Sequence, residues 1–174
     1  MVVKAMLSGN NIVTENSELA RDLFNKGCFG SVLANGCVKL SVLEAVYLVE
    51  KKRLQVFDGR NKLVSFDRLL KRAARIEKSF WVRYPVFRDF RNRGYVIKTA
   101  LKFGADFRVY DRGKKPGEEH AKWVVFAVSE SNVLTWHDFA AKNRVAHSTR
   151  KKLLIGVVDD EGDVSYWEVR WVRP

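Results

Sequence analysis

The stretch 123-WVVFAVSESNVLTWHDFAAKNRVAHSTRKKLLIGVV-158 decides the fold of the C-terminal half of this chain. It opens with the apolar run Trp123–Val128, which is typical of a buried strand. A capping box at Thr135–Asp138 predicts a helix that ends near Asn143. Lys152–Val158 is another strand-like run, so the stretch predicts a strand, a helix and a strand in that order.

Further strands are predicted on both sides of this stretch. Tyr95–Thr99 and Phe103–Tyr110 precede it, and Val164–Val172 follows an acidic turn at Asp159–Asp163. A helix is expected before these strands, with Pro85 in its first turn, where a proline is well tolerated. This order of elements predicts a mixed β-sheet flanked by helices.

The N-terminal half, residues 1–80, is predicted to form a separate small α/β domain, and residues 81–174 the second domain. The boundary is expected near Phe80-Trp81. The first domain should contain short strands, capped helices and a hairpin. These are strands at Val2–Leu7 and Ile12–Thr14, helix caps at Asn16 or Ser17, at Ser41 and at Ser65, and a hairpin over Leu54–Val64. None of these features carries chemistry.

Composition favours a folded protein with a polyanionic partner. Of 174 residues, 47% are hydrophobic and 30% are charged, which is enough apolar material for a core. The net charge of +12 favours RNA, DNA or an anionic membrane, although a solvated basic surface would also explain it. Residues 1–80 hold 14 Lys/Arg and 8 Asp/Glu, and residues 81–174 hold 18 and 12, so both halves are basic. With no long apolar run and no signal-peptide pattern, a cytoplasmic location is expected.

Three residues of the second half, Tyr110, His120 and Lys151, supply what RNA cleavage without a metal needs. A base must take the proton from a ribose 2′-oxygen, an acid must protonate the departing 5′-oxygen, and a cation should neutralise the phosphorane. An imidazole, with a pKa near ~6.5, suits the acid. A phenol, with a pKa of about 10, needs cationic neighbours to act as the base, and the candidates are Lys151, Arg112 and Lys114.

Each of the three residues also has an ordinary structural explanation. Tyr110 could be a packing residue at the end of a strand, and Lys151 could belong to a solvated basic run. His120 could form a surface salt bridge with Glu118 or Glu119. Taken one at a time, the structural explanations are the stronger ones, and only the combination favours catalysis.

Longer stretches resemble a known family. Residues 94–125, GYVIKTALKFGADFRVYDRGKKPGEEHAKWVV, and 144–164, RVAHSTRKKLLIGVVDDEGDV, closely resemble the archaeal tRNA-splicing (tRNA-intron) endonucleases. The resemblance extends more loosely through residues 40–59, LSVLEAVYLVEKKRLQVFDG, and residues 65–77, SFDRLLKRAARIE. It therefore covers nearly the whole chain and implies that the second domain is the nuclease domain.

In this resemblance Tyr110, His120 and Lys151 fall on the family's motifs in order, and their spacings of 10 and 31 residues agree with its short form. The family cuts precursor tRNA at both edges of an intron folded as a bulge–helix–bulge. It leaves a 2′,3′-cyclic phosphate and a 5′-hydroxyl, and it uses no metal ion or other cofactor. By resemblance, Tyr110 would be the general base, His120 the general acid and Lys151 the cation of the transition state.

The resemblance also implies RNA-binding residues and an assembly. Arg144 matches an arginine that clamps a bulged base, and Trp171 is the candidate for its partner near the C-terminus. Family members this short work as homotetramers. The acidic turn Asp159–Asp163 could dock into a basic pocket of another copy, with a solvated turn as the alternative. The run Tyr166–Val172 could pair or pack across a dimer seam.

Three rival functions stay open at this point. The chain could be a catalytically inert structural subunit of the same complex, although such a subunit has no need of the complete trio. It could be a tRNA-binding module that does not cleave. It could also be a metal-dependent nuclease. The residues that superficially suggest such a carboxylate–lysine site, although their spacing is poor, are Asp106, Glu118, Glu119 and Lys122.

Overall fold

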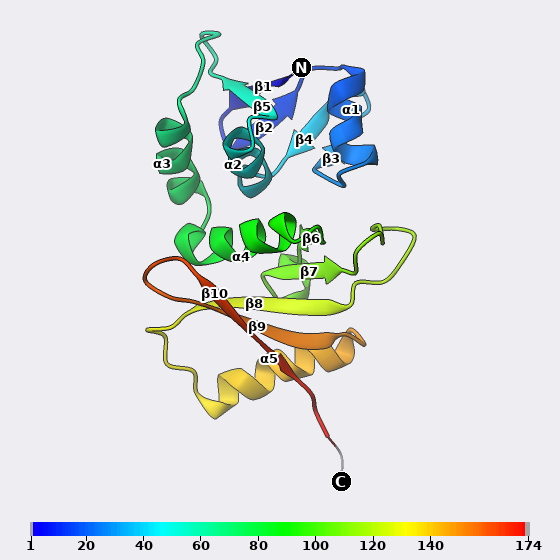
Figure 1. Ribbon diagram of the computed structural model, residues 1–174, viewed down its shortest axis with the longest axis vertical. Helices are drawn as coiled ribbons and strands as arrows, with labels where there is room; N and C mark the ends of the chain where they lie inside the picture. The colour runs from blue at the N-terminus through cyan, green and yellow to red at the C-terminus, as the bar shows by residue number, and fades with distance from the viewer. Residues whose placement is uncertain (1, 173–174) are drawn as a thin grey trace. The chain divides into compact units, whose positions relative to one another are not determined.

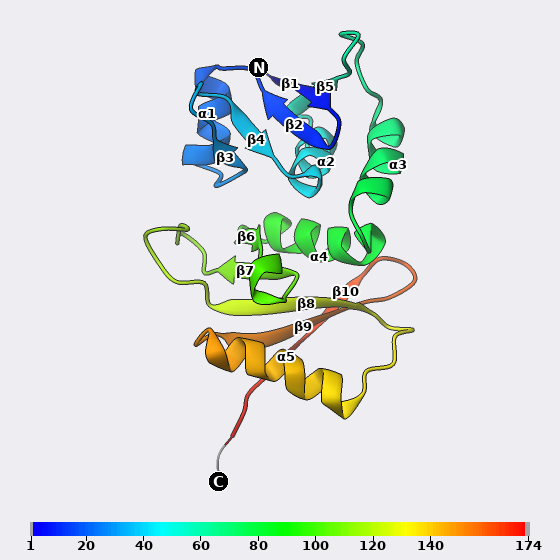
Figure 2. The same ribbon diagram turned by 180° about the vertical axis from the view of Figure 1, so that it is seen from behind.

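The computed structural model describes residues 2–172, and the chain divides into two compact units, Met1–Phe80 and Trp81–Pro174. Each unit contains its own five-stranded mixed sheet (Figures 1 and 2). The mixed α/β class expected from the sequence is therefore confirmed. Within residues 2–172, none of the helices combines the length and the hydrophobicity needed to cross a bilayer.

The first unit is built on a sheet with the strand order β3-β4-β2-β1-β5, in which β1 and β5 run parallel and the other neighbours antiparallel. Helix α3 packs against α2. The elements in chain order are β1 (Val3–Ser8), β2 (Asn11–Thr14), α1 (Glu18–Asn25), β3 (Ser31–Val32), β4 (Val38–Leu40), α2 (Val42–Glu50), β5 (Leu54–Phe57) and α3 (Phe66–Ile76).

The helices of the first unit begin at side-chain caps, as the sequence predicts. Ser17 and Ser65 each accept a hydrogen bond from the backbone N–H three residues later. Ser41 forms a complete capping box with Glu44, in which each side chain binds the other residue's backbone N–H. Because α2 is buried from Val42 to Leu48, it forms the centre of this unit's core.

The second unit is built on a sheet with the order β10-β9-β8-β7-β6, in which only β8 and β9 run parallel. The helix α5 connects these two parallel strands. The elements in chain order are α4 (Phe80–Asn92), β6 (Val96–Thr99), the 3₁₀ turn η1 (Leu101–Phe103), β7 (Phe107–Tyr110), β8 (Trp123–Ser129), α5 (Trp136–Ser148), β9 (Lys152–Val158) and β10 (Val164–Val169).

Helices cover both faces of the second sheet, α4 on one face and α5 on the other (Figures 1 and 2). On the α5 side, the core cluster includes Ala146 of the helix and alternate residues of the central strands, Val124, Phe126, Leu153 and Ile155. On the α4 side, a Cβ at Gly156 would lie 3.2 Å from Val86, so the helix and β9 are in close contact. Burial on both faces explains why β8 and β9 are continuous apolar runs rather than alternating ones.

A buried ion pair joins α4 to the sheet. Arg83, which is 4% exposed, lies with its Nε 3.0 Å from Oδ1 of Asp106 and donates from Nη2 to the Asp106 carbonyl. The other oxygen of the carboxylate accepts the backbone N–H of Ala127 in β8. Burial lowers the pKa of the Arg83 guanidinium, and the charge of Asp106 opposes that shift. The guanidinium also lies 4.8 Å from the centre of the Phe107 ring.

The prediction for Pro85 is wrong. The helix α4 starts at Phe80, so the proline lies inside the helix and not in its first turn. An interior proline costs about 3 kcal/mol, because it has no N–H to donate. Phe80, Tyr84 and Phe87 are each at most 5% exposed, and the burial of these aromatic side chains outweighs the cost.

Other boundaries were also predicted incorrectly. The strand expected over 103–110 is only β7, because Leu101–Phe103 form a 3₁₀ turn that ends at Gly104 with φ +74°. Helix α5 continues past Asn143 to Ser148, since Val145 and Ala146 pack on the sheet. The last strand ends at Val169 rather than Val172.

The hairpin expected over Leu54–Val64 is present: Phe57 and Leu63 form an antiparallel bridge, and the N–H groups of Asp58 and Val64 donate to the carbonyls of Lys62 and Val56. Its first arm, β5, also pairs in parallel with β1 on its other side. The short strands β3 and β4 had no counterpart among the predictions, because two or three residues are too few to show a periodic pattern.

Asp106→Ala should destabilise the protein by roughly 1–3 kcal/mol, because it removes the carboxylate that pairs with the buried Arg83 guanidinium and accepts the N–H of Ala127. Asp22→Ala is the matched control, since it removes the carboxylate of an exposed pair with Lys26 and should cost at most about 1 kcal/mol. Urea unfolding followed by circular dichroism measures both. Equal losses in the two variants would contradict a special role for the buried pair.

Candidate active site

Backbone hydrogen bonds align the three strands that carry or directly follow the candidate catalytic residues. The N–H of Lys122 donates to the carbonyl of Val109 at 2.8 Å, and the N–H of Lys152 donates to the carbonyl of Lys122 at 3.1 Å. This row crosses the sheet where β7 ends and where β8 and β9 begin. We call this border of the second sheet the Lys122 edge, and it lies at the right of Figure 1.

All three candidates belong to the Lys122 edge. Tyr110 directly follows Val109, and Lys151 directly precedes Lys152. His120 lies in the loop that leads into β8, two residues before Lys122. Since neighbouring strands are ~4.8 Å apart, the backbones of Tyr110 and Lys151 are separated by about 10 Å, with the His120 segment entering between them. The order of the strands in the sheet thus brings together segments that lie far apart in the sequence.

The three side chains differ in their surroundings. Tyr110 is 4% exposed, with the Arg108 guanidinium 5.9 Å from the centre of its ring. His120 is exposed. Lys151 is half-buried, and its ammonium donates to the carbonyl of Thr149 at the C-terminal end of α5. The negative end of the helix dipole and this carbonyl both favour a cation there.

The loop before β8 contains two salt bridges, and His120 takes part in neither of them. Lys114 binds Glu119 at 2.7 Å, and Lys122 binds Asp111 at 3.0 Å. The hydrogen bond from Lys114 lowers the pKa of the Glu119 carboxyl. His120 itself forms no ion pair within residues 2–172, so the surface salt bridge with Glu118 or Glu119 considered from the sequence is not formed there.

The cations expected around Tyr110 are distributed differently from the prediction. The Arg112 guanidinium lies over Tyr95, 4.9 Å from the ring centre, and Lys114 is bound to Glu119. Arg108, which was not among the predicted neighbours, is the cation found over the Tyr110 ring. The two-residue period of a strand could have indicated it, because residues 108 and 110 share one face of β7.

The carboxylate of Glu168 in β10 holds the starts of β8 and β9. It accepts the indole N–H of Trp123 at 2.9 Å and the ammonium of Lys152 at 3.1 Å, and Arg170 approaches it at 3.2 Å. The hydrogen bonds from Trp123 and Lys152 lower the pKa of Glu168 to about 2. Trp123 and Lys152 directly adjoin the segments of His120 and Lys151, so Glu168 braces the Lys122 edge from the neighbouring strand.

A hollow of about 570 Å³ adjoins the C-terminal half of α5, and we call it the α5 hollow. Arg144 and Trp171, the two predicted RNA-binding residues, both line it. His147 also lines it, with its ring centre 5.0 Å from that of Trp171 in an edge-on arrangement. The remaining lining residues are Phe139, Ala140, Asn143 and Ser148. Aromatic rings and a guanidinium facing one cavity are suited to holding a flat, unpaired base.

The carboxylates considered for a metal site are engaged at separate places. Asp106 is bound by Arg83 before the start of β7, whereas Glu119 is bound by Lys114 beyond its end. Lys122 is paired with Asp111. Within residues 2–172, no three His, Cys, Asp or Glu side chains are arranged so that they could hold a metal ion together.

Both units match one family of RNA-processing enzymes. Residues 80–166 match the tRNA intron endonuclease catalytic C-terminal domain, and residues 3–70 match its N-terminal domain. A tRNA-splicing endonuclease of Thermococcus onnurineus is 39% identical over 171 residues, which cover 98% of this chain and 97% of that protein. The tRNA-splicing endonuclease of Methanothermobacter thermautotrophicus is 36% identical over the full length of both chains. That of Nanoarchaeum equitans is 43% identical over 84% of this chain and 97% of its own.

The second unit is therefore the catalytic domain of an endonuclease. The chain as a whole belongs to the tRNA intron endonuclease family, which confirms the family resemblance noted from the sequence.

Glu168→Gln should lower the melting temperature at pH 7, because the ionised carboxylate stabilises the Lys122 edge. With a pKa of about 2 in the folded protein and an ordinary value of 4.5, this stabilisation is complete above about pH 5 and disappears as the pH falls towards 2. Calorimetry from pH 7 to pH 2 should show the difference from wild type shrinking over that window. Glu118→Gln, at an exposed carboxylate, is the control. A difference that stays constant with pH would exclude the carboxylate as its source.

Proposed function

We propose that this enzyme cleaves precursor tRNA at both splice sites of a bulge–helix–bulge, leaving a 2′,3′-cyclic phosphate and a 5′-hydroxyl, without a metal ion. The observation that carries the proposal is the hydrogen-bonded row Val109, Lys122 and Lys152, which supports a common site for three residues far apart in sequence. The domain division 1–80 and 81–174 belongs to the same proposal, with the chemistry in the second domain.

The roles follow from what each group can do at the Lys122 edge. Tyr110 is the general base that takes the 2′-hydroxyl proton, and the Arg108 guanidinium lies over its ring. His120 is the general acid, and its exposure lets it approach the departing 5′-oxygen. Lys151 neutralises the charge that builds on the phosphorane. A residue is thus proposed for each of the two proton transfers and for the negative charge of the phosphorane.

The α5 hollow supplies the contact to the bulge. Arg144 and Trp171 hold one unpaired base between a guanidinium and an indole. The hollow adjoins the site, because Lys151 lies three residues beyond the end of α5 and its N–H donates to the carbonyl of Ala146 in that helix. A base held there fixes the position of the neighbouring phosphate relative to Lys151.

We propose a homotetramer, in which the acidic turn Asp159–Asp163 docks on another copy. Asp159 organises the turn, since its carboxylate accepts the N–H groups of Glu161 and Asp163. The side chains of Asp160, Glu161 and Asp163 remain exposed on a strongly basic protein, which supports a contact with a positive surface. Two copies with productively placed sites would suit the two cuts in one intron.

The test of the function is incubation of the purified chain with a bulge–helix–bulge RNA in excess EDTA, with mapping of both ends. Cleavage at both bulges, with cyclic phosphate and 5′-hydroxyl ends, is the expected result. Activity that requires a divalent ion would overturn the mechanism. Binding without cleavage would favour the alternative, a structural or RNA-binding subunit that needs a catalytic partner chain.

His120→Ala should slow single-turnover cleavage at least ~10²-fold and leave RNA affinity nearly unchanged, because the acid acts only on the leaving oxygen. His137→Ala is the matched control: it removes another exposed imidazole, at the opposite end of α5 from Lys151. A loss of activity explained wholly by weaker RNA binding would contradict the acid role.

Neutralising the acidic turn with Asp160→Asn, Glu161→Gln and Asp163→Asn should reduce the mass of the assembly measured by light scattering. Wild type in about 1 M salt provides the comparison, because the Debye length falls to about 3 Å and weakens the same contact. If both samples keep the full mass, the turn is a solvated loop and does not hold the copies together.

A further inference from the structure

One face of α3, in the first unit, carries four cations. Arg68, Lys71, Arg72 and Arg75 are spaced by three or four residues and therefore lie along the same side of the helix. The other side buries Leu69 and Ala73. Like charges at these spacings oppose helix formation, so the stability of the helix does not explain them.

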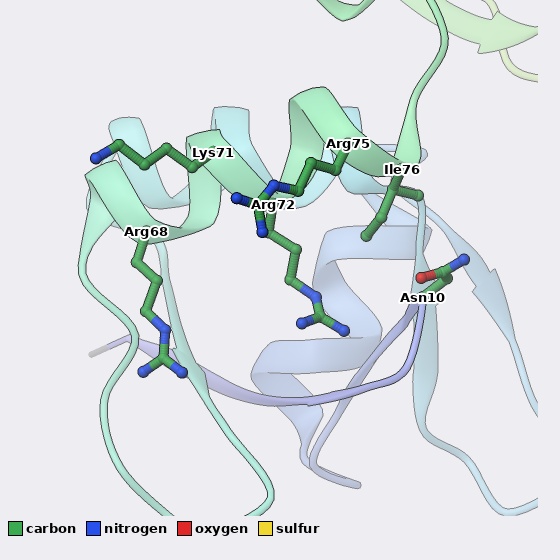
Figure 3. Close-up of a pocket in the computed structure, with 6 residues that line it drawn as sticks. All are labelled: Asn10, Arg68, Lys71, Arg72, Arg75 and Ile76. Carbon is green, nitrogen blue, oxygen red and sulfur yellow. The ribbon is translucent and has the colours of Figure 1, made fainter.

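These cations line a groove of about 540 Å³, which we call the α3 groove (Figure 3). Its other lining residues are Ile76 and Asn10, the latter in the turn between β1 and β2. Arg72 is fixed in place, since its guanidinium donates to the carbonyl of Gly9 at 2.6 Å.

The outer cations of the groove are available to a ligand. Arg68, whose side chain is largely exposed, lies 3.5 Å from Asp58 at one end. Lys71 and Arg75 form no ion pair within residues 2–172. From residue 68 to residue 75 the helix rises about 10 Å, so the positive charge is spread along a line.

We propose that the α3 groove binds the phosphate backbone of the tRNA body, outside the bulge–helix–bulge that the second unit cuts. The inference rests on the proposed function for the identity of the RNA. Lys, Arg and Asn side chains are the groups that contact phosphate and sugar. A line of cations suits a continuous backbone better than a single small anion.

The groove differs from the α5 hollow in having no aromatic residue among its lining side chains. Binding of single-stranded RNA depends on aromatic rings that stack on bases. The arginines and the lysine of the groove can contact phosphates, but no aromatic ring lines it to pair with a guanidinium around an unstacked base, which favours paired RNA. The contact is accordingly independent of sequence and sensitive to salt.

The test compares Lys71→Gln/Arg75→Gln with a matched control, Lys4→Gln/Lys39→Gln. The control removes the same charge from exposed lysines of β1 and β4 outside the groove. Two RNAs are used, a full precursor tRNA and a minimal bulge–helix–bulge duplex without the tRNA body. Affinity is measured over a series of salt concentrations, together with single-turnover cleavage, melting temperature and the mass of the assembly.

The groove variant should bind the full precursor more weakly than the control does. Its slope of log affinity against log salt should fall by about 2, one for each phosphate that the variant no longer neutralises. Binding and cleavage of the minimal duplex should match the control, with melting temperature and mass unchanged.

Equal affinities and slopes for the two variants on the full precursor would overturn the inference, even with wild-type cleavage intact. A lower assembly mass in the groove variant would also overturn it, because the groove would then hold another copy. Failure of wild type to cleave either RNA is a separate result: it would reject the proposed function, while the difference in slopes still reports on the groove.

Discussion

The parallel pairing of β8 with β9 is the constraint on which the second unit depends. Parallel strands begin at the same border of a sheet, and the antiparallel β7 ends at that border. The pairing of Trp123 with Lys152 therefore sets where the segments of His120 and Lys151 lie relative to Tyr110. A slip of one residue would move Lys151 by about 3.3 Å and turn the side chains of β9 to the opposite faces of the sheet.

Packing along the strands and polar contacts near both of their ends stabilise this register. Helices α4 and α5 bury both faces, so a slipped β9 would no longer match its apolar neighbours. At the Lys122 edge, Glu168 holds Trp123 and Lys152. Towards the other end, Asp106 holds Arg83 of α4 and the N–H of Ala127 near the end of β8. The candidate site is thus positioned by groups other than the three candidate catalytic residues.

The sequence alone was enough to predict those elements whose signals lie within a few neighbouring residues. The caps at Ser41 and Thr135 and the apolar runs of β8 and β9 each carry their signal within a few residues. Tyr110, His120 and Lys151 were chosen as candidates because their chemistry is complementary and because they fall on the motifs of the resembled family, although neither reason showed that they belong to one edge of the sheet. The start of α4 could not be found, because the burial that tolerates Pro85 depends on the folded unit.

Contacts between distant residues had no sequence signal at all. Glu168 lies 45 residues from Trp123, and Tyr166, which donates to Asp89, lies 77 residues away from it. Neither pair follows a helical or strand period, so no pattern indicates which carboxylate will meet which donor. Residues that hold a site in place are for this reason harder to predict than residues that react.

The two proposed RNA-binding surfaces, the α3 groove and the α5 hollow, would favour different features of an RNA, because their side chains differ in kind. A guanidinium and an indole can hold a base only where the base is unpaired, so such a contact can select the place of a cut. Cations along a helix contact phosphates of any sequence, and they add the same affinity wherever the base pairs change. The equal basicity of both halves of the chain fits this proposed division, in which the first unit would strengthen binding without influencing which bond is broken.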